Sequence, residues 1–181
     1  MQLLNPDAFD QVYHIMEGSF PEDERRTRAG QRALLDESAY RIYVQPAPDS
    51  DAPMGFLAVW DFDRFAYIEH FAVAPAYRCC GVGSRLLREL VAQLDKPVCL
   101  EVEPPETELA VRRIGFYRRC GFFLNEYPYL QPALAPDRKT LPLMVMTSGG
   151  TISRPQFELL RGVLYQRVYR VSPQQFAQLK I

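Results

Sequence analysis

The residues best suited to chemistry form a glycine-containing turn near the middle of the chain. The segment reads Arg78-Cys79-Cys80-Gly81-Val82-Gly83 and follows a strand-like stretch that ends at Val73. Glycine has no Cβ, so the backbone of such a turn can approach a ligand closely, and unpaired N–H groups at a helix start favour an anion. A phosphate or pyrophosphate is the ligand that this turn would take. The turn lacks the Lys-Ser/Thr of a P-loop, and a plain strand-to-helix connection is the alternative.

Strand-like and helix-like stretches alternate around this turn. Residues 65–73 are rich in aromatic and β-branched types, which favour a strand, whereas leucines recur at helical spacing over residues 83–94. Strands are expected at 40–45, 54–61, 65–73, 97–102, 122–126 and 141–147, and helices at 6–16, 83–94, 106–120 and in a segment ending near residue 38. The first two strands should form an antiparallel hairpin. This order predicts an α/β (α+β) fold with a mixed sheet.

The last thirty residues look like an added helical tail. Gly149-Gly150 separates a domain over residues 1–150 from a C-terminal helical extension over residues 151–181. The extension holds two Ser-x-x-Gln capping boxes, which begin at Ser153 and Ser172. One apolar stripe runs along its first helix: Phe157, Leu160, Leu164 and Val168. Packing on the parent domain is the favoured interpretation of this stripe, and a homodimer is the alternative.

Composition and charge argue against several classes of protein. The 181 residues are 48% hydrophobic, enough for one continuous core, and the net charge of −1 argues against a nucleic-acid binder. The charge is uneven, because residues 1–77 carry −7 and residues 78–181 carry +6, so the basic part could face an anionic ligand. No apolar run is long enough for a membrane span, and the N-terminus lacks the pattern of a secretory signal. We expect a cytoplasmic protein that binds no membrane.

Metal chemistry has little support in the sequence. The four cysteines include the adjacent pair Cys79-Cys80 but no CxxC pair, and only two histidines could supply imidazole. We therefore expect no metal and reduced thiols.

Two short sequence motifs lie one after the other among the predicted strands and helices. The first, Phe71-Ala72-Val73 followed by Arg78 to Gly83, has the form hydrophobic-Ala-Val and then Arg/Gln-x-x-Gly-x-Gly/Ala. The second reads Phe116-Tyr117-Arg118-Arg119-Cys120-Gly121-Phe122 and begins about 35 residues later. Together they resemble the GNAT superfamily of acyl-CoA-dependent N-acetyltransferases, from Pro6 to about Thr147. The resemblance implies a GNAT-like, mostly antiparallel central sheet flanked by helices and splayed between the fourth and fifth strands.

The resemblance also implies acetyl-CoA as co-substrate. The backbone N–H groups that would hold its pyrophosphate are those of Cys79, Cys80, Gly81, Val82, Gly83 and Ser84, with Arg78 at the start of the loop. The edge formed by Phe71, Ala72 and Val73 would pair with the pantetheine amides. Many relatives carry Asn and Ala where this chain has Ala110 and Arg113, so Arg113 or Arg112 is expected to reach a CoA phosphate, unless both belong to a solvated helix face.

Acetyl transfer to an amine needs a neutral nucleophile, a donor for the carbonyl oxygen and a proton for the leaving thiolate. Tyr117 matches the family's phenol that protonates the thiolate, and a backbone N–H near Val73 would serve the carbonyl oxygen. Glu69 is the candidate general base, because strand alternation places it on the face of Tyr67 and Phe71.

Other residues are alternative candidates for the general base, or lie near Glu69 in the sequence or at the predicted site. Glu101 and Glu103, at the end of the next strand, are alternative bases, and a salt-bridged Glu69 is also open. His70 is expected on the opposite strand face, packed or bonded to solvent. In the family, the positions of residues 20–26 and 127–132 flank the acceptor cleft, and their acids and tyrosines would suit a cationic amine.

The sequence thus predicts an N-acetyltransferase that moves an acetyl group from acetyl-CoA to a primary amine by direct attack in a ternary complex. The acceptor would be a small molecule or a peptide. The alternative is a protein of the same fold that senses acyl-CoA without turnover or serves as an interaction module.

Overall fold

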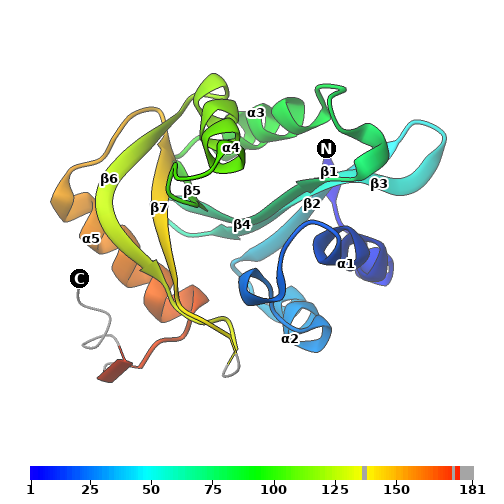
Figure 1. Ribbon diagram of the computed structural model, residues 1–181. Helices are drawn as coiled ribbons and strands as arrows, with labels where there is room; N and C mark the ends of the chain where they lie inside the picture. The colour runs from blue at the N-terminus through cyan, green and yellow to red at the C-terminus, as the bar shows by residue number, and fades with distance from the viewer. Residues whose placement is uncertain (136–137, 173, 176–181) are drawn as a thin grey trace. The chain divides into compact units, whose positions relative to one another are not determined.

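The computed structural model describes residues 1–135, 138–172 and 174–175 (Figure 1). The chain divides into two compact units, Met1–Cys99 and Leu100–Ile181, and each is described by itself. No helix among the described residues has the length and apolar character needed to cross a membrane.

The first unit is built on antiparallel strands. Their order is β1 (Gln2–Leu3), β2 (Tyr40–Ala47), β3 (Ser50–Asp61) and β4 (Ala66–Val73), and each pairs antiparallel with the next. The predicted hairpin is confirmed, and its strands extend into the expected turn until Ala47 pairs with Ser50. Strand β5 (Val98–Val102) starts beside the start of β4, where the Ala66 N–H donates to the Pro97 carbonyl at 2.9 Å. These two strands therefore run parallel, which makes the sheet mixed.

Helices cover both faces of strands β2 to β4. Figure 1 shows α1 (Phe9–Glu17) and α2 (Arg28–Ala33) on one face and α3 (Val82–Leu94) on the other. Short 3-10 turns connect them: Pro6–Ala8, Glu22–Glu24, Leu34–Asp36 and Pro75–Tyr77. Asn5 caps the first of these turns, because its Oδ1 accepts from the Asp7 N–H at 3.1 Å. The apolar sides of α1 and α3 are buried, including Phe9, Met16 and the leucines at 86, 87 and 90.

The second unit continues β5 and adds a strand pair with helices. Helix α4 (Glu108–Arg119) begins at the cap Thr107, and β6 (Phe122–Gln131) pairs antiparallel with β7 (Leu141–Ser148). The strand order here is β5-β7-β6. Strand β6 is longer than the predicted strand, which ended at residue 126, so residues 127–131 are also strand. A register shift between Asn125 and Tyr129 accommodates Pro128, which has no N–H for a regular ladder.

The tail belongs to the second unit. Helix α5 (Arg154–Val163) opens with the predicted Ser153–Gln156 capping box and continues into a π-helical turn, Leu164–Val168. The predicted stripe is buried: Phe157, Leu160, Leu164 and Val168. Packing within the unit therefore accounts for the stripe, and a homodimer stays a prediction. The second capping box also forms, since Ser172 Oγ accepts from the Gln175 N–H at 3.2 Å. The helix expected after it lies mostly outside the described residues, and the domain boundary at 150 stays a prediction.

One glycine allows β3, β4 and α3 to approach one another. Gly55 pairs with Val73, and a Cβ added there would lie 2.9 Å from the Ala72 carbonyl oxygen and 3.2 Å from Leu86 Cδ1. The carbonyl belongs to the backbone of β4, so it can move only if the strand moves. Gly55 therefore sets the position of the end of β4, after which the turn of residues 78–83 follows.

We predict that Gly55→Ala destabilises the protein by about 1–3 kcal/mol, because the added methyl group overpacks a buried strand pair. The same shift of β4 should weaken acetyl-CoA binding. Gly162→Ala is the matched control, since a Cβ at that position in α5 meets no atom within 4 Å and alanine favours a helix. Urea denaturation of both variants measures the effect. A Gly55→Ala protein as stable as the Gly162→Ala protein would contradict it.

Candidate active site

A side chain of the turn after β4 stabilises the shape of that turn. The Arg78 side chain reaches back, and its Nε–H donates to the Val73 carbonyl at 3.0 Å. Cys79 and Gly81 adopt left-handed backbone conformations, with φ of +62° and +75°. Glycine takes such a φ at little cost, whereas a residue with a Cβ does so rarely. The turn therefore has a fixed, unusual shape that delivers the chain directly into α3.

The start of α3 fits an anionic group. Gly81 is the N-cap, and no side chain of the described residues caps this helix start. The first N–H groups of a helix have no intrahelical acceptor, and the helix dipole adds partial positive charge there. Ser84 Oγ turns back to the Gly81 carbonyl at 3.0 Å, and a Cβ at Gly81 would meet nothing within 4 Å. The turn is thus open to a ligand, and its N–H groups suit a pyrophosphate.

The adjoining end of β4 is paired with β3 on one edge. Phe71, Ala72 and Val73 lie opposite Leu57, Phe56 and Gly55. This pairing fixes the strand that was predicted to bind the pantetheine amides. The pantetheine contact itself stays a prediction.

A β-bulge in β4 changes the predicted strand faces. Ala58 pairs with His70 and Val59 with Ile68, so Glu69 is an extra residue without a partner in the register. A bulge reverses the alternation beyond it, because two residues occupy the place of one. Tyr67 and His70 consequently share one face, and Phe71 lies on the other. The prediction that Tyr67 and Phe71 share a face is therefore wrong.

Glu69 lies at the centre of a buried polar cluster. Its side chain is only 1% exposed, and its carboxylate forms an ion pair and a short hydrogen bond with Arg26. The Trp60 Nε1–H donates to the same carboxylate at 3.3 Å, and His70 Nδ1 lies 3.8 Å from it. Glu69 and His70 thus meet in one cluster, although alternation had predicted opposite faces.

These surroundings hold Glu69 as an anion. Burial raises its pKa, but the charges of Arg26 and His70 and the hydrogen bonds from Arg26 and Trp60 outweigh burial, so the net pKa is lowered. Burial also lowers the pKa of His70, against the opposing charge of Glu69, so its ring is neutral at pH 7. A carboxylate with a lowered pKa is a weak proton acceptor. The role of Glu69 as general base stays a prediction.

The same cluster fastens residues 20–26 to β4. His70 Nε2 lies 2.8 Å from the Glu24 carbonyl oxygen, and the Phe20 ring packs edge-on against His70 at 4.9 Å. The Tyr13 hydroxyl donates to the Arg26 carbonyl at 3.1 Å, which ties the segment to α1 as well. Residues 20–26, which were predicted to flank the acceptor cleft, are thus held in place by hydrogen bonds to their backbone and by the buried side chain of Arg26.

In the second unit, Tyr117 lies near the end of α4. Its ring contacts Phe116 and Phe122, with centroids 5.3 Å and 6.1 Å apart. Burial raises its pKa to about 12, although the charge of Arg113 acts in the opposite direction. The phenol is therefore protonated at neutral pH, as a proton donor must be.

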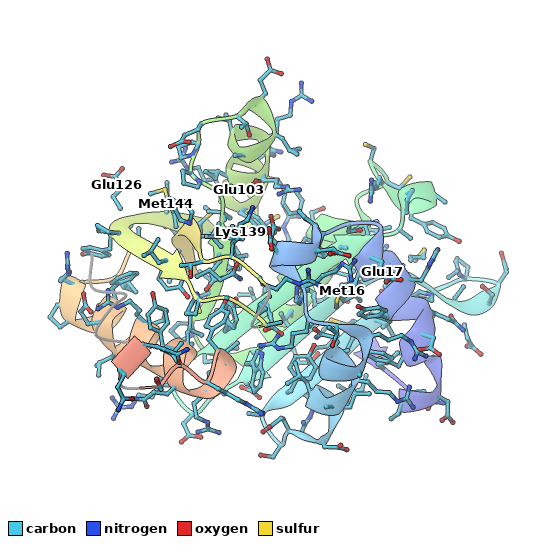
Figure 2. The ribbon with its side chains drawn as sticks, turned by 60° about the horizontal axis from the view of Figure 1, so that its bottom comes forward. Met16, Glu17, Glu103, Glu126, Lys139 and Met144 are labelled. Carbon is cyan, nitrogen blue, oxygen red and sulfur yellow. The ribbon has the colours of Figure 1, made fainter. Side chains whose placement is uncertain are left out.

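Arg113 and Glu103 form a surface ion pair in the second unit. Glu103, labelled in Figure 2, accepts a hydrogen bond from Arg113 Nη1 at 2.8 Å, and both side chains are about two-fifths exposed. A pair this exposed contributes little to stability. The predicted contact of Arg113 with a CoA phosphate stays a prediction.

A second polar cluster surrounds Glu101. The carboxylate accepts hydrogen bonds from the Tyr129 hydroxyl and from the Tyr169 hydroxyl, the latter at 2.7 Å and 2.9 Å to its two oxygens. Sequence reasoning named Glu101 as an alternative base but missed both tyrosines. Tyr169 is 68 residues away in the tail, and no local pattern links it to β5.

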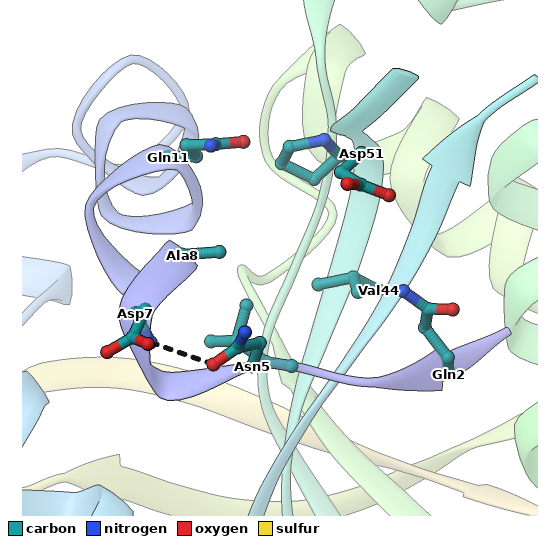
Figure 3. A pocket seen from close by; sticks show the side chains of 9 residues that line it. Gln2, Asn5, Asp7, Ala8, Gln11, Val44 and Asp51 are labelled. Atoms are coloured by element: carbon teal, nitrogen blue, oxygen red, sulfur yellow. Dashed lines mark hydrogen bonds between the residues drawn. The ribbon is translucent and has the colours of Figure 1, made fainter. Parts of the chain in front are cut away.

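A hollow of about 390 Å³ lies elsewhere in the first unit (Figure 3). Residues of β1, the Pro6–Ala8 turn, α1 and the β2–β3 hairpin line it, among them Asn5, Asp7, Gln11 and Asp51. These polar side chains are exposed. None of the residues predicted to serve the site lines this hollow.

Comparison with solved structures defines the class of protein. A protein assigned to the GNAT family of acetyltransferases from Bacteroides thetaiotaomicron is 37% identical, with a TM-score of 0.84 over 92% of this chain and 94% of that chain. The ribosomal-protein-S18-alanine N-acetyltransferase from Escherichia coli is 19% identical, with a TM-score of 0.63 over 84% and 94%. An aminoglycoside 6′-N-acetyltransferase in complex with coenzyme A is 16% identical, with a TM-score of 0.56 over 82% and 96%. The chain therefore has the fold of the GNAT acetyltransferases.

Comparison of the sequence with known protein families identifies the family of the chain. Residues 9–122 match the Acetyltransferase (GNAT) family, so the chain belongs to the GNAT family of acetyltransferases. The predicted family, fold class and enzyme class are confirmed. No curated protein matches the sequence significantly.

We predict that Gly81→Asp abolishes acetyl-CoA binding. The substitution places a β-carbon at a φ of +75° and a carboxylate at the helix start, where it would repel a pyrophosphate. Gly81→Asn is the matched control, because asparagine has nearly the same shape, tolerates a positive φ better than most residues and carries no charge. Calorimetric titration should show a larger loss for aspartate than for asparagine. Unchanged affinity in a folded Gly81→Asp protein would contradict the cofactor site.

Proposed function

We propose that this protein transfers an acetyl group from acetyl-CoA to a primary amine by direct attack in a ternary complex. The observation that carries the proposal is the start of α3, which follows β4 in a chain of the GNAT family. No side chain that the structure describes caps this helix start, and a Cβ at Gly81 would meet none of the described atoms within 4 Å. The family uses acetyl-CoA, and one structural neighbour was solved with coenzyme A.

The proposed cofactor site uses the backbone more than side chains. The N–H groups from Cys79 to Ser84 bind the pyrophosphate, and Arg78 shapes the turn through its bond to the Val73 carbonyl. The end of β4, from Phe71 to Val73, binds the pantetheine arm. When bound, acetyl-CoA supplies an activated thioester whose carbonyl carbon accepts the amine.

Tyr117 is the proposed general acid. As the C–S bond breaks, the sulfur leaves as a thiolate, and a proton from the Tyr117 hydroxyl converts it to the thiol of CoA. A pKa of about 12 keeps that proton on the phenol at neutral pH, so the group enters the reaction as a proton donor. Edge-on contacts with Phe116 and Phe122 restrict the movement of the ring.

The proposed acceptor is an amine of a small molecule or a peptide. The neighbours named above act on a ribosomal-protein alanine and on aminoglycosides, and other neighbours of this fold are spermidine N-acetyltransferases from Vibrio cholerae. These acceptors share an amine and little else, so the fold alone does not choose among them. A cytoplasmic location and the absence of nucleic-acid or membrane partners stay predictions.

We predict that Tyr117→Phe lowers kcat at least tenfold with little change in the Kd of acetyl-CoA, because general acid assistance is typically worth about 10²- to 10⁴-fold and the ring contacts remain. Measurement requires kcat under conditions where chemistry limits the rate, and the Kd by calorimetry.

Tyr117→Leu is the companion variant, since it removes both the ring and the hydroxyl. If the ring matters only for packing, Tyr117→Phe will keep kcat within twofold of wild type while Tyr117→Leu loses stability and activity. That result would remove the general-acid role and leave water to protonate the thiolate.

A further inference from the structure

Two exposed thiols lie in the turn that is proposed to bind the pyrophosphate of acetyl-CoA. Cys79 and Cys80 directly precede Gly81, the N-cap of α3, and both side chains are exposed. The backbone N–H groups of this turn are the proposed donors to the cofactor, so a group attached to either sulfur would lie beside the pyrophosphate. The other cysteine of the first unit, Cys99, is only 1% exposed. Within this unit, only the thiols of the turn are open to a reagent from solvent.

The two thiols differ in their hydrogen bonds. The Cys80 Sγ–H donates to the Arg78 carbonyl at 3.4 Å. Within the part of the chain that the structure describes, the thiol of Cys79 has no such bond and no disulfide partner. Cys79 is therefore the more available nucleophile of the two.

A disulfide between the two neighbours is disfavoured. The peptide between Cys79 and Cys80 is trans, and a trans peptide places adjacent Cα atoms about 3.8 Å apart. Residues joined by a disulfide usually have Cα atoms about 4.4–6.8 Å apart. An oxidant that reaches Cys79 is therefore expected to leave it bonded to a partner from solvent and not to Cys80.

We propose that Cys79 is a site of reversible modification by an anionic low-molecular-weight disulfide, with glutathione disulfide as its representative, and that this modification blocks acetyl-CoA binding. The inference rests on the proposed function, because it concerns the regulation of the proposed cofactor site. It adds to that function the residue that is modified and the chemical class of the reagent.

The charge that suits a pyrophosphate also suits this reagent. The first N–H groups of α3 carry partial positive charge, and no side chain of the described residues caps them. Arg78 and Arg85, which lie before and after the N-cap Gly81 in the sequence, are both exposed. Glutathione disulfide has more carboxylates than ammonium groups, so it is a net anion. The same local field that attracts the cofactor therefore attracts the disulfide.

The exchange step balances in atoms and electrons. The Cys79 thiol loses its proton to solvent, and the thiolate attacks one sulfur of glutathione disulfide. The S–S bond of the reagent breaks as a new S–S bond forms to Cys79 Sγ, and the second glutathione leaves as a thiolate that takes a proton from solvent. Cys79 is oxidised and one glutathione is reduced. An excess of free thiol reverses the exchange.

A glutathionyl group on Cys79 opposes the cofactor by charge and by volume. Its net negative charge lies two residues before the N-cap, close to where the pyrophosphate is proposed to bind, and like charges repel most strongly at short distance. A Cβ at Gly81 would meet none of the described atoms within 4 Å, so the space over the turn is open in the unmodified protein. The cofactor and the glutathionyl group compete for this space, so each should suppress the other.

The first test compares acetyl-CoA binding before and after modification. Wild-type protein is treated with glutathione disulfide, peptide mapping by mass spectrometry identifies the modified cysteine, and calorimetry measures the Kd of acetyl-CoA. We expect a glutathionyl group on Cys79 and a Kd raised about tenfold or more, which dithiothreitol restores. Methyl methanethiolsulfonate is the matched reagent, because it caps the same thiol with a small uncharged group. It should raise the Kd less.

Three variants assign the effect to one thiol. In each protein the Kd of the treated form is divided by the Kd of the reduced form, so that any effect of the substitution on binding itself cancels. Cys79→Ser should lose the increase in this ratio, whereas Cys80→Ser should keep it. Cys120→Ser removes a thiol of the second unit and controls for modification elsewhere in the chain, so it should also keep the increase.

The converse measurement is the rate of modification. Saturating acetyl-CoA should slow the glutathionylation of Cys79 about tenfold or more, because the occupied turn excludes the reagent. The rate at Cys120 in the same samples shows whether acetyl-CoA affects the exchange reaction in general.

The outcomes separate this inference from the proposed function. Equal affinity of reduced and glutathionylated protein for acetyl-CoA would overturn the inference and leave the cofactor site intact. A glutathionyl group on Cys80 in place of Cys79, or a disulfide between the two without glutathione, would do the same. Reduced wild type that binds no acetyl-CoA would overturn the proposed function and this inference with it. The measurements on wild type need no substitution, so they decide even if a Cys→Ser variant fails to fold.

Discussion

The buried ion pair between Glu69 and Arg26 is the constraint on which the first unit depends. Both charges have left water, so each must be compensated by the other and by nearby donors such as the Trp60 N–H. Removing one partner of such a pair typically costs about 3–5 kcal/mol, because the other charge stays buried alone. The pair joins a bulge in the central strand to the segment after α1. The two elements therefore cannot shift independently, and β4, which leads to the proposed pyrophosphate site, is held in place.

The same constraint explains how charge is distributed in the site. A guanidinium beside Glu69 secures the carboxylate as an anion, which suits a structural role better than proton transfer. At the end of β4, the Arg78 side chain donates instead to a backbone group, the Val73 carbonyl, next to the helix start that is proposed to bind a pyrophosphate. In the second unit the proposed general acid is a group of another kind, the phenol of Tyr117, with a pKa of about 12. The proposed proton donor, Tyr117, is thus a different side chain from the buried ion pair that holds the first unit together.

Much of the fold around the β4–α3 turn could be predicted from local sequence patterns. The leucine spacing of α3, the β-branched run of β4 and the turn between them are local features, and the structure has them where the pattern predicts. The bulge at Glu69 was missed because an extra residue leaves no mark in a strand-like sequence, yet it reverses which residues share a face. The Glu101–Tyr169 contact was missed because it joins residues far apart in the chain. The length of β6 was underestimated because Pro128 resembles a strand breaker, and a register shift accommodates it.

The most direct test of the account is the simultaneous measurement of free CoA and acetylated amine after mixing the protein with acetyl-CoA and a panel of amines, polyamines, aminoglycosides and peptides. Both products should be quantified by chromatography and mass spectrometry, because the exposed Cys79 and Cys80 would react with a thiol dye. The account predicts equal amounts of both products with at least one amine, and no CoA release without an amine. Tight acetyl-CoA binding with no CoA release from any amine would contradict it and indicate a sensor of acyl-CoA.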